Sequence, residues 1–277
     1  MFLMLEPYPP GCICSAGWYI KAKSNILGGL LLKSPKPSLI LLMLLSQLAY
    51  AAWGAHLPGV TSTLPVSKDE KILYLTLDAC KGSVDVSLIN FLIERKIPTT
   101  FFINAQWINK NPEAFMKLAE NPLFEIENHG TKHLPASVSG KSIYGFKGTE
   151  SKEKLIEEIM VNHEKIKKLT GREPRWFRSG CAYYDSEAVK IIKEELNLNI
   201  AGFAITLDVG ATLPAQEVYE RTITAKSGDI LLAHVNNPKG GTARGLEKAI
   251  PELLARGFVF KTLPKLPQTM ENREKDL

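Results

Sequence analysis

The chain has 277 residues, of which 45% are hydrophobic and 23% charged, and this balance is typical of a globular protein with a sizeable core. The formal net charge is +5 and the pI is about 8.9, but no arginine-rich or basic–aromatic stretch accompanies it, which argues against a nucleic-acid-binding protein. A mildly basic surface is also compatible with anionic cell-envelope polymers as partners. The net charge alone therefore does not identify a partner.

Residues 1–51 form a leader, and residues 30–51 have the order of a secretory signal peptide. Two lysines precede an apolar run from Leu39 to Leu45, and the small-x-small sequence Ala49-Tyr50-Ala51 follows. The apolar run is too short for a bilayer-spanning helix, which needs about 20 residues. We therefore expect export to the periplasm or the medium, with cleavage after Ala51 and no stable membrane span afterwards. An uncleaved N-terminal anchor is the alternative.

The stretch before Leu30 makes this leader longer than an ordinary signal of roughly 15–30 residues. We therefore expect translation to begin near Leu30 to Leu32. Cleavage after the signal would remove two of the four cysteines and leave Cys80 and Cys181. Two cysteines make no disulfide framework for a domain of this size, and small buried thiols are the commoner outcome.

Short apolar runs alternate with longer amphipathic segments in residues 71–266, between an expected linker at 52–70 and a polar tail at 267–277. The expected strands cover residues 71–78, 98–104, 123–129, 174–178, 200–208, 229–235 and 258–263. The expected helices cover residues 86–96, 112–120, 150–169, 186–196, 215–225 and 246–257. The alternation predicts a single α/β domain with a parallel sheet, and its repeats suit a small or distorted barrel. A dinucleotide-binding fold is disfavoured because no GxGxxG follows the first strand.

Ionisable residues close several of the expected apolar strands. In a parallel β/α barrel the catalytic residues collect at the C-terminal ends of the strands, which converge on one rim. The residues at these ends are Asp78, Glu127, His129 with His133 just beyond, Arg178, Asp208 and His234. So many ionisable strand ends are hard to explain as surface decoration, and they predict an active site at this rim.

The sequence HGTKH places His129 and His133 four residues apart, a spacing that allows two imidazoles to face one cation. The spacing alone is a weak signal, because loop histidines often bond only to the backbone. Its place beside other ionisable strand ends favours a metal site.

Arg178 follows an apolar strand, so its buried guanidinium needs an anionic partner. Asp78 is the first candidate, and an ion pair with Asp208 is the alternative. His234 ends a fully apolar strand and is expected to act as a proton donor. His163 lies on a charged helix and is expected to be solvated.

Residues 72–263 resemble the polysaccharide deacetylases of carbohydrate esterase family 4, whose fold is a distorted (β/α)7 barrel. The family motifs T-F-D-D-G, H-[ST]-x-x-H and R-x-P-x-x-F-R are similar to TLDAC, HGTKH and REPRWFR in this chain. A fourth motif corresponds loosely to TLDVGA around Asp208, and a fifth, a leucine-x-histidine strand, to LLAH ending at His234. Five motifs in the right order make the resemblance specific.

The resemblance implies metal-assisted hydrolysis of an N- or O-linked acetyl group on a glycan. A divalent metal, typically zinc, would be held by His129 and His133 and would polarise the acetyl carbonyl. Asp78 would act as the general base and His234 as the general acid.

Four further residues receive supporting roles from the same resemblance. Arg178 would orient the general base, and Asp208 would tune its basic neighbours. Backbone N–H groups near Gly180 and Cys181 would help to hold the oxyanion.

The first motif departs from the family pattern, because Ala79 stands where the family has a metal-binding aspartate. Two histidines leave a cation short of the usual three protein ligands. The replacement candidates, in order, are Asp78 itself and Asp85 at the start of the next helix, followed by Glu127 and Cys80. A site that has lost its metal is the remaining possibility.

Two features near the expected rim have open interpretations. Cys80 and Cys181 flank the site and could form a disulfide, if their Cα atoms lie within roughly 7 Å. The segment 135–148 carries Tyr144 and Phe146 among glycines and serines, and could be a lid on which a sugar ring packs or an ordinary connection.

The sequence thus predicts an exported hydrolase that removes acetyl groups from a cell-envelope or extracellular polysaccharide. One alternative is a metal-independent hydrolase of cyclic amides with the same fold. Another is a glycan-binding module whose chemistry has lapsed through Ala79. Asp78 and His234 argue against this lapse, because a binding module needs neither an acid nor a base.

Overall fold

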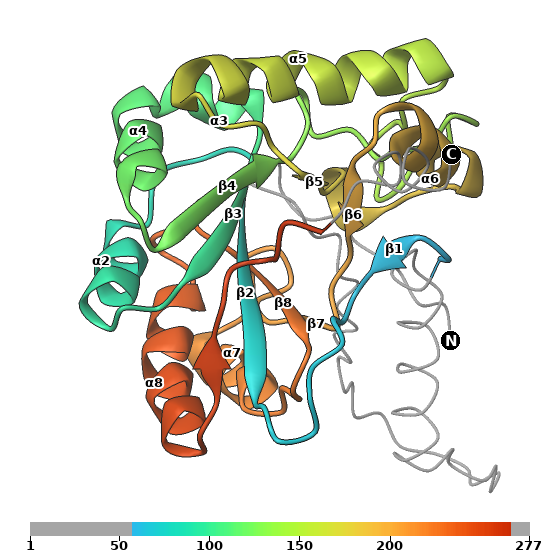
Figure 1. Cartoon of the computed structure of the whole chain (residues 1–277). Helices are drawn as coiled ribbons and strands as arrows, with labels where there is room; N and C mark the ends of the chain where they lie inside the picture. Colours follow the sequence, from blue (N-terminus) through green and yellow to red (C-terminus); the bar gives the residue numbers. More distant parts are fainter. Residues whose placement is uncertain (1–56, 267–277) are drawn as a thin grey trace, which may run out of the picture.

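A curled parallel sheet lies at the centre of the computed structural model, which describes residues 57–266 (Figure 1). Its strands follow the order β1-β6-β5-β4-β3-β2-β8-β7, and β9 pairs with β2. All pairings between these strands are parallel. The predicted α/β fold with a distorted barrel is therefore confirmed.

The elements have the following bounds. The strands are β1 (Val60–Thr61), β2 (Ile72–Ala79), β3 (Thr99–Ile103), β4 (Phe124–Asn128), β5 (Trp176–Phe177), β6 (Asn199–Ala201), β7 (Ile205–Thr206), β8 (Ile230–His234) and β9 (Val259–Phe260). The helices are α2 (Val86–Glu94), α3 (Ala105–Lys110), α4 (Pro112–Glu120), α5 (Lys152–Thr170), α6 (Ser186–Lys190), α7 (Ala215–Thr222) and α8 (Thr242–Ala255), with a 3-10 turn η1 (Gly180–Ala182) and a π turn η2 (Ile191–Glu195).

Strand β2 is buried along its whole length and separates two apolar clusters. Leu75 and Leu77 belong to the core between the sheet and the outer helices, and Ala79 follows them there. Tyr74 points to the other face, into a cluster with residues of β3, β5 and β8 inside the curl. Because side chains alternate along a strand, Asp78 shares this inner face.

The segment before β2, expected to be a linker, takes part in the sheet. Its strand β1 pairs with β6. The N–H of Ile230 donates to the Ser62 carbonyl at 3.1 Å, and the N–H of Leu64 donates to the Gly228 carbonyl at 2.8 Å. Residues 60–64 therefore connect the β6 side of the curl to the chain that enters β8.

Helix α5 covers the sheet with a face that contains polar as well as apolar side chains. Ser151 caps its first turn, and Gly171 ends it in the left-handed region at a φ of 68°. The expectation that His163 is solvated is wrong: it is 4% exposed, and its Nε2 lies 3.4 Å from Glu173. Leu155, Glu158, Ile159, Asn162 and Ile166 are the other buried residues of this helix.

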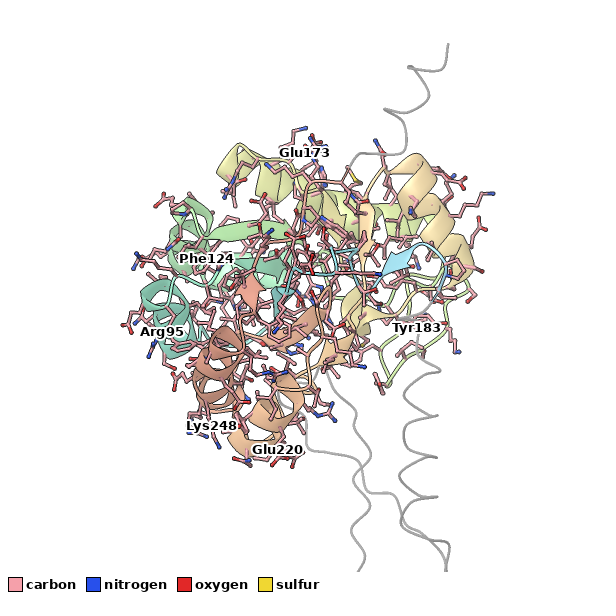
Figure 2. The ribbon with its side chains drawn as sticks, turned by 60° about the horizontal axis from the view of Figure 1, so that its bottom comes forward. Arg95, Phe124, Glu173, Tyr183, Glu220 and Lys248 are labelled. Carbon is pink, nitrogen blue, oxygen red and sulfur yellow. The ribbon has the colours of Figure 1, made fainter. Side chains whose placement is uncertain are left out.

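The outer helices carry the charged surface. Arg95, Glu220 and Lys248 lie at the edge of the molecule in Figure 2 and are exposed. Within residues 57–266, no helix is long and apolar enough to cross a membrane. The expected signal peptide, start site and polar tail lie outside these residues and stay predictions.

Candidate active site

The polar residues expected at the strand ends lie close together in the folded chain. Asp78 and His234 are register partners on the neighbouring strands β2 and β8, so their side chains leave the sheet on the same face. Strand β4 pairs with β5 at its last residue, and His129 and Arg178 directly follow these two strands. The shared rim predicted from the sequence is therefore present.

Asp78 forms a buried ion pair with Arg178. The guanidinium Nη1 donates to Asp78 Oδ1 at 2.7 Å and to Thr76 Oγ1 at 2.9 Å, and Nη2 donates to the Gly202 carbonyl at 2.9 Å. Arg178 is 0% exposed and lies over the ring of Phe102, with 4.3 Å between the guanidinium carbon and the ring centroid. The first candidate for its partner is confirmed, and these contacts fix one oxygen of the carboxylate.

Asp208 holds His234 in a second buried network. Its Oδ1 lies 2.8 Å from His234 Nδ1, and its Oδ2 accepts from the His234 backbone N–H and from Thr242 Oγ1, both at 2.8 Å. A carboxylate only accepts hydrogen bonds, so Nδ1 carries the hydrogen of this contact. Nε2 is then the ring nitrogen that Asp208 does not hold.

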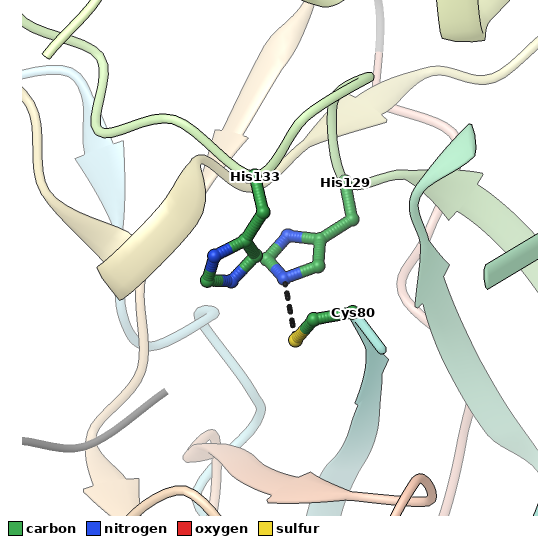
Figure 3. Close-up of side chains that lie close together, drawn as sticks. All are labelled: Cys80, His129 and His133. Carbon is green, nitrogen blue, oxygen red and sulfur yellow. Dashed lines mark hydrogen bonds between the residues drawn. The ribbon is translucent and has the colours of Figure 1, made fainter. Parts of the chain in front are cut away.

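A third cluster joins Cys80, just beyond β2, to His129 and His133 (Figure 3). One ligand atom from each residue lies within 4.8 Å of the others. Cys80 Sγ is 3.5 Å from His129 Nε2, and the two imidazole centroids are 4.7 Å apart. All three side chains are buried.

A backbone contact sets the tautomer of His129. Its Nδ1 lies 2.7 Å from the Arg178 carbonyl, which can only accept, so Nδ1 carries a hydrogen. Its Nε2 lies 3.5 Å from Cys80 Sγ and 3.5 Å from Asp78 Oδ2. Such a second hydrogen bond is typical of histidines that bind metals. Two imidazoles and one sulfur are donors that suit zinc.

Two residues considered as third ligands have other roles. Asp85 caps α2, because its Oδ1 accepts from the Leu88 N–H at 3.1 Å and from Ser87 Oγ at 2.8 Å. Glu127 accepts the backbone N–H groups of Arg175 and Trp176 at 2.7 and 2.8 Å. Burial raises the pKa of Glu127 to about 8, although these two donors favour the charged form. The carboxylates of Asp85 and Glu127 are thus committed to the fold.

Two expectations about the turn after Arg178 are corrected. The N–H of Gly180 donates to the Leu134 carbonyl at 3.1 Å, which removes it as an oxyanion donor. Cys80 and Cys181 form no disulfide with each other or with any other described residue. Cys80 Sγ instead lies 3.5 Å from His129 Nε2.

Glu158 on α5 supports the histidine loop and was missed from the sequence. Its carboxylate accepts the backbone N–H groups of Thr131, Lys132 and Leu134 at 2.9–3.1 Å. Burial raises the pKa of Glu158, against the effect of these donors. The missed signal was a glutamate three residues after the buried Leu155, on the apolar face of the helix.

The segment 135–148, for which a lid and an ordinary connection were both open, contains a tight turn beside the histidines. Ile143 and Phe146 exchange backbone hydrogen bonds around Tyr144 and Gly145, both of which have positive φ, a combination typical of a tight hairpin turn. The ring of Phe146 lies 6.4 Å from that of His133, and Tyr144 is 38% exposed at the tip. An aromatic edge therefore borders the site, and its contact with sugar stays a prediction.

Comparison with known proteins gives related deacetylases and one pseudoenzyme. The profile of the family described as polysaccharide deacetylase matches residues 66–199. A peptidoglycan-N-acetylglucosamine deacetylase of Bacillus cereus is 28% identical over 214 residues, which cover 74% of this chain and 92% of that protein.

Solved structures with this fold are more distant in sequence. Bacillus subtilis PdaA, a family 4 carbohydrate esterase, is 19% identical with a TM-score of 0.59, and the match covers 79% of this chain and 86% of that one. BA3943 of Bacillus anthracis, a CE4 family pseudoenzyme, is 18% identical with a TM-score of 0.59; the match covers 71% of this chain but only 65% of that one. The profile and the Bacillus cereus relative, joined to this common fold, show that the chain belongs to the polysaccharide deacetylase family.

Proposed function

We propose that the protein is an exported, metal-assisted hydrolase that removes acetyl groups from a cell-envelope polysaccharide, with the N-acetylglucosamine units of peptidoglycan as the first substrate to test. The observation that carries this proposal is that Asp78 and His234 are in register on the adjacent strands β2 and β8, and that each is held in a buried pair, Asp78 with Arg178 and His234 with Asp208. The named activity of the Bacillus cereus relative supports the choice of substrate. The leader sequence supports export.

Asp78 is placed to act as the base that takes a proton from the attacking water. Arg178 holds Oδ1, while Oδ2 lies 3.5 Å from the ring nitrogen of His129. The guanidinium offsets the cost of burying the carboxylate and fixes its orientation. A fixed and desolvated carboxylate accepts a proton without first rearranging a shell of water.

His234 is placed to protonate the leaving nitrogen or oxygen. Asp208 binds Nδ1–H, fixes the ring orientation and stabilises the imidazolium when Nε2 is protonated. Thr242 and the backbone N–H of His234 occupy the other oxygen of Asp208. With that oxygen already engaged, the carboxylate cannot turn away from the ring.

His129 and His133 would hold the divalent metal, for which zinc is the first candidate. When bound, such a metal polarises the acetyl carbonyl and lowers the pKa of its water. The site supplies nitrogen and sulfur donors at spacings that fit a single ion. The members of this family are generally metal-dependent, which supports the same conclusion.

The experiment measures acetate release from peptidoglycan and from N-acetylated chitooligosaccharides. We expect the full chain to release acetate, and the D78N and H234N variants to lose about 10²–10⁴-fold in rate. D85N is the matched control, because Asp85 is a buried aspartate that caps α2 and asparagine is an equally good cap. It should keep the parent rate.

Two results would overturn the proposal. Retention of glycan binding without acetate release, in the metal-loaded parent, would indicate a binding protein comparable in kind to the pseudoenzyme BA3943. Hydrolysis of cyclic amides by protein stripped of metal would indicate the metal-independent alternative. Acetate release that survives D78N would instead remove Asp78 as the base.

A further inference from the structure

We infer that Cys80 supplies the third protein ligand of the metal site, as a thiolate beside His129 and His133. The inference rests on the proposed metal-assisted function, and it names the side chain that replaces the carboxylate missing at Ala79. Two histidines alone would leave the ion with fewer than the three protein ligands of an ordinary catalytic zinc site.

The alternation of side chains along β2 explains why Cys80, and not Ala79, lies on the same side of the strand as the histidines. Ala79 is in register with Ile103 and is fully buried in the core between the sheet and the outer helices. Asp78 and Cys80 are two residues apart, so both face the inside of the curl. The sequence Asp-Ala-Cys therefore puts a carboxylate and a sulfur on the side of the strand that carries the site.

The spacing of the three donors matches a single ion. For tetrahedral zinc with bonds of about 2.3 Å to sulfur and about 2.1 Å to nitrogen, the ligand atoms are about 3.4–3.6 Å apart. Cys80 Sγ and His129 Nε2 are 3.5 Å apart. His133 brings its donor within 4.8 Å of the other two. A small movement of one imidazole therefore completes a three-ligand site.

The surroundings hold His129 and Cys80 as neighbouring ligands. The Arg178 carbonyl accepts from Nδ1 of His129, so Nε2 is the ring nitrogen that faces the sulfur. Cys80 is 2% exposed, and a thiolate in such a place needs a cation as its partner. On metal binding, the S–H bond breaks, its proton leaves to solvent and a sulfur–metal bond forms.

This ligand set determines which metals the protein takes. A thiolate carries the same single negative charge as the carboxylate it replaces, so the charge of the loaded site is kept. Sulfur is a soft ligand that suits zinc and cobalt, whereas magnesium and calcium prefer oxygen. We expect the chain to bind Zn²⁺ and Co²⁺ and not Mg²⁺ or Ca²⁺. One coordination position is left for water or substrate.

The test uses the full chain, purified without a histidine tag, stripped of metal and loaded with Co²⁺. A sulfur–cobalt bond gives an intense charge-transfer absorption in the near ultraviolet, which nitrogen and oxygen ligands do not produce. We expect this band in the parent and in C181S, the matched control at the other described cysteine. We expect no band in C80S, together with a loss of Zn²⁺ affinity greater than the roughly 10–100-fold caused by removing a hydrogen-bonding partner of a ligand.

A second variant, C80D, restores a carboxylate at the inner-facing position and should bind Co²⁺ without the band. If C80S does not fold, the spectrum of the parent still decides: bound cobalt without the band overturns the inference. A band that survives C80S, or that C181S removes, overturns it as well. Each of these three outcomes would overturn Cys80 as a ligand, but acetate release by the metal-loaded parent would still support the proposed function. Failure to bind either metal, by contrast, would overturn both.

Discussion

At the scale of single residues, two buried charged groups are stabilised in different ways. The Arg178 guanidinium donates hydrogen bonds to the Asp78 carboxylate, the Thr76 hydroxyl and the Gly202 carbonyl. The negative charge of Asp78 compensates its positive charge. Within the part of the chain that the structure describes, Glu127 accepts only from two backbone N–H groups, although it is also deeply buried. Hydrogen bonds to neutral donors offset less of the cost of burying a charge than an ion pair does, which is why burial dominates and raises the pKa of Glu127 to about 8.

This raised pKa makes the stability of the protein depend on pH. The pKa of Glu127 rises from an ordinary 4.5 to about 8 on folding, so between these values the unfolded chain has lost a proton that the folded chain still holds. The free energy of unfolding therefore falls as the pH rises through this window, with a limiting slope of about 1.4 kcal/mol per pH unit. Below it both states are protonated, and above it both are ionised.

The E127Q variant tests this prediction. Glutamine keeps an oxygen for the two N–H groups but cannot ionise, so the stability of E127Q relative to the parent should rise between pH 5 and pH 8, the span over which the carboxyl titrates. Urea unfolding at several pH values measures the difference. E125Q, at a half-buried glutamate on the same strand, should follow the parent. Parallel curves for E127Q and the parent would show that Glu127 is ionised throughout.

The residues of the site could be predicted only in part. Asp78, His129, Arg178 and His234 were evident because each follows an apolar strand, and strand ends of a parallel sheet share one rim. The third donor was not evident, because side-chain alternation along β2 does not show how closely Cys80 approaches the two histidines. Asp85 and Glu127 both accept from backbone N–H groups, and a sequence pattern does not show these contacts.

At the scale of elements, the loop between β4 and α5 holds the two histidines. Gly130 has a φ of 77°, and a Cβ there would lie 2.5 Å from the Glu158 carboxylate. His133 also has a positive φ, of 67°, which is costly for a residue with a side chain. The three N–H groups that Glu158 accepts hold the loop in this conformation. Residue 130 therefore has no room for a side chain, because the carboxylate occupies that space.

The G130A variant should weaken metal binding as well as the fold. Its methyl group would push the Glu158 carboxylate away from the loop, so both His133 and the metal affinity should change. G171A is the matched control, since Gly171 has a similar φ of 68° and a methyl group added there would meet no heavy atom of another segment within 4 Å. We expect G171A to lose about 1–2 kcal/mol of stability and no Zn²⁺ affinity. Equal losses of both quantities in the two variants would show that Glu158 has no part in placing the loop.

Most of the longer elements could be predicted from periodicity, and the short ones could not. The strand expected at 200–208 is wrong, because this stretch forms two short strands, β6 and β7, that pair with different neighbours. The strand expected at 71–78 is β2, and the helix expected at 150–169 is α5 to within two residues. Helix α8 begins a turn before its expected start at Leu246, because Thr242 and Ala243 are small and give no strong periodic signal. The six-residue helix α3 between β3 and α4 was missed, since it is too short to show a helical period.

At the scale of the whole molecule, backbone strain collects on the rim that carries the site. Non-glycine residues with positive φ are uncommon, because the Cβ then meets the neighbouring carbonyl. Seven of the described ones lie in connections on the C-terminal side of the sheet: His133, Tyr144, Glu150, Cys181, Ala182, Val209 and Ala211. Strained positions of this kind persist only where the surrounding structure holds them, and they are typical of functional sites. The rest of the barrel must therefore be rigid enough to support them.

That rigidity depends in part on the segment before β2, which closes the curl. Leu64 is 7% exposed and packs with residues of β2, β5 and β8 inside the sheet. We expect L64A to lower the free energy of unfolding by about 2–5 kcal/mol, the usual cost of truncating a buried leucine. V66A is the control, because Val66 is only partly buried against the same cluster and should cost less. Thermal and urea unfolding measure both. A change within about 0.5 kcal/mol for L64A would mean that residues 57–66 behave as the linker expected from the sequence, because surface substitutions have effects of this size.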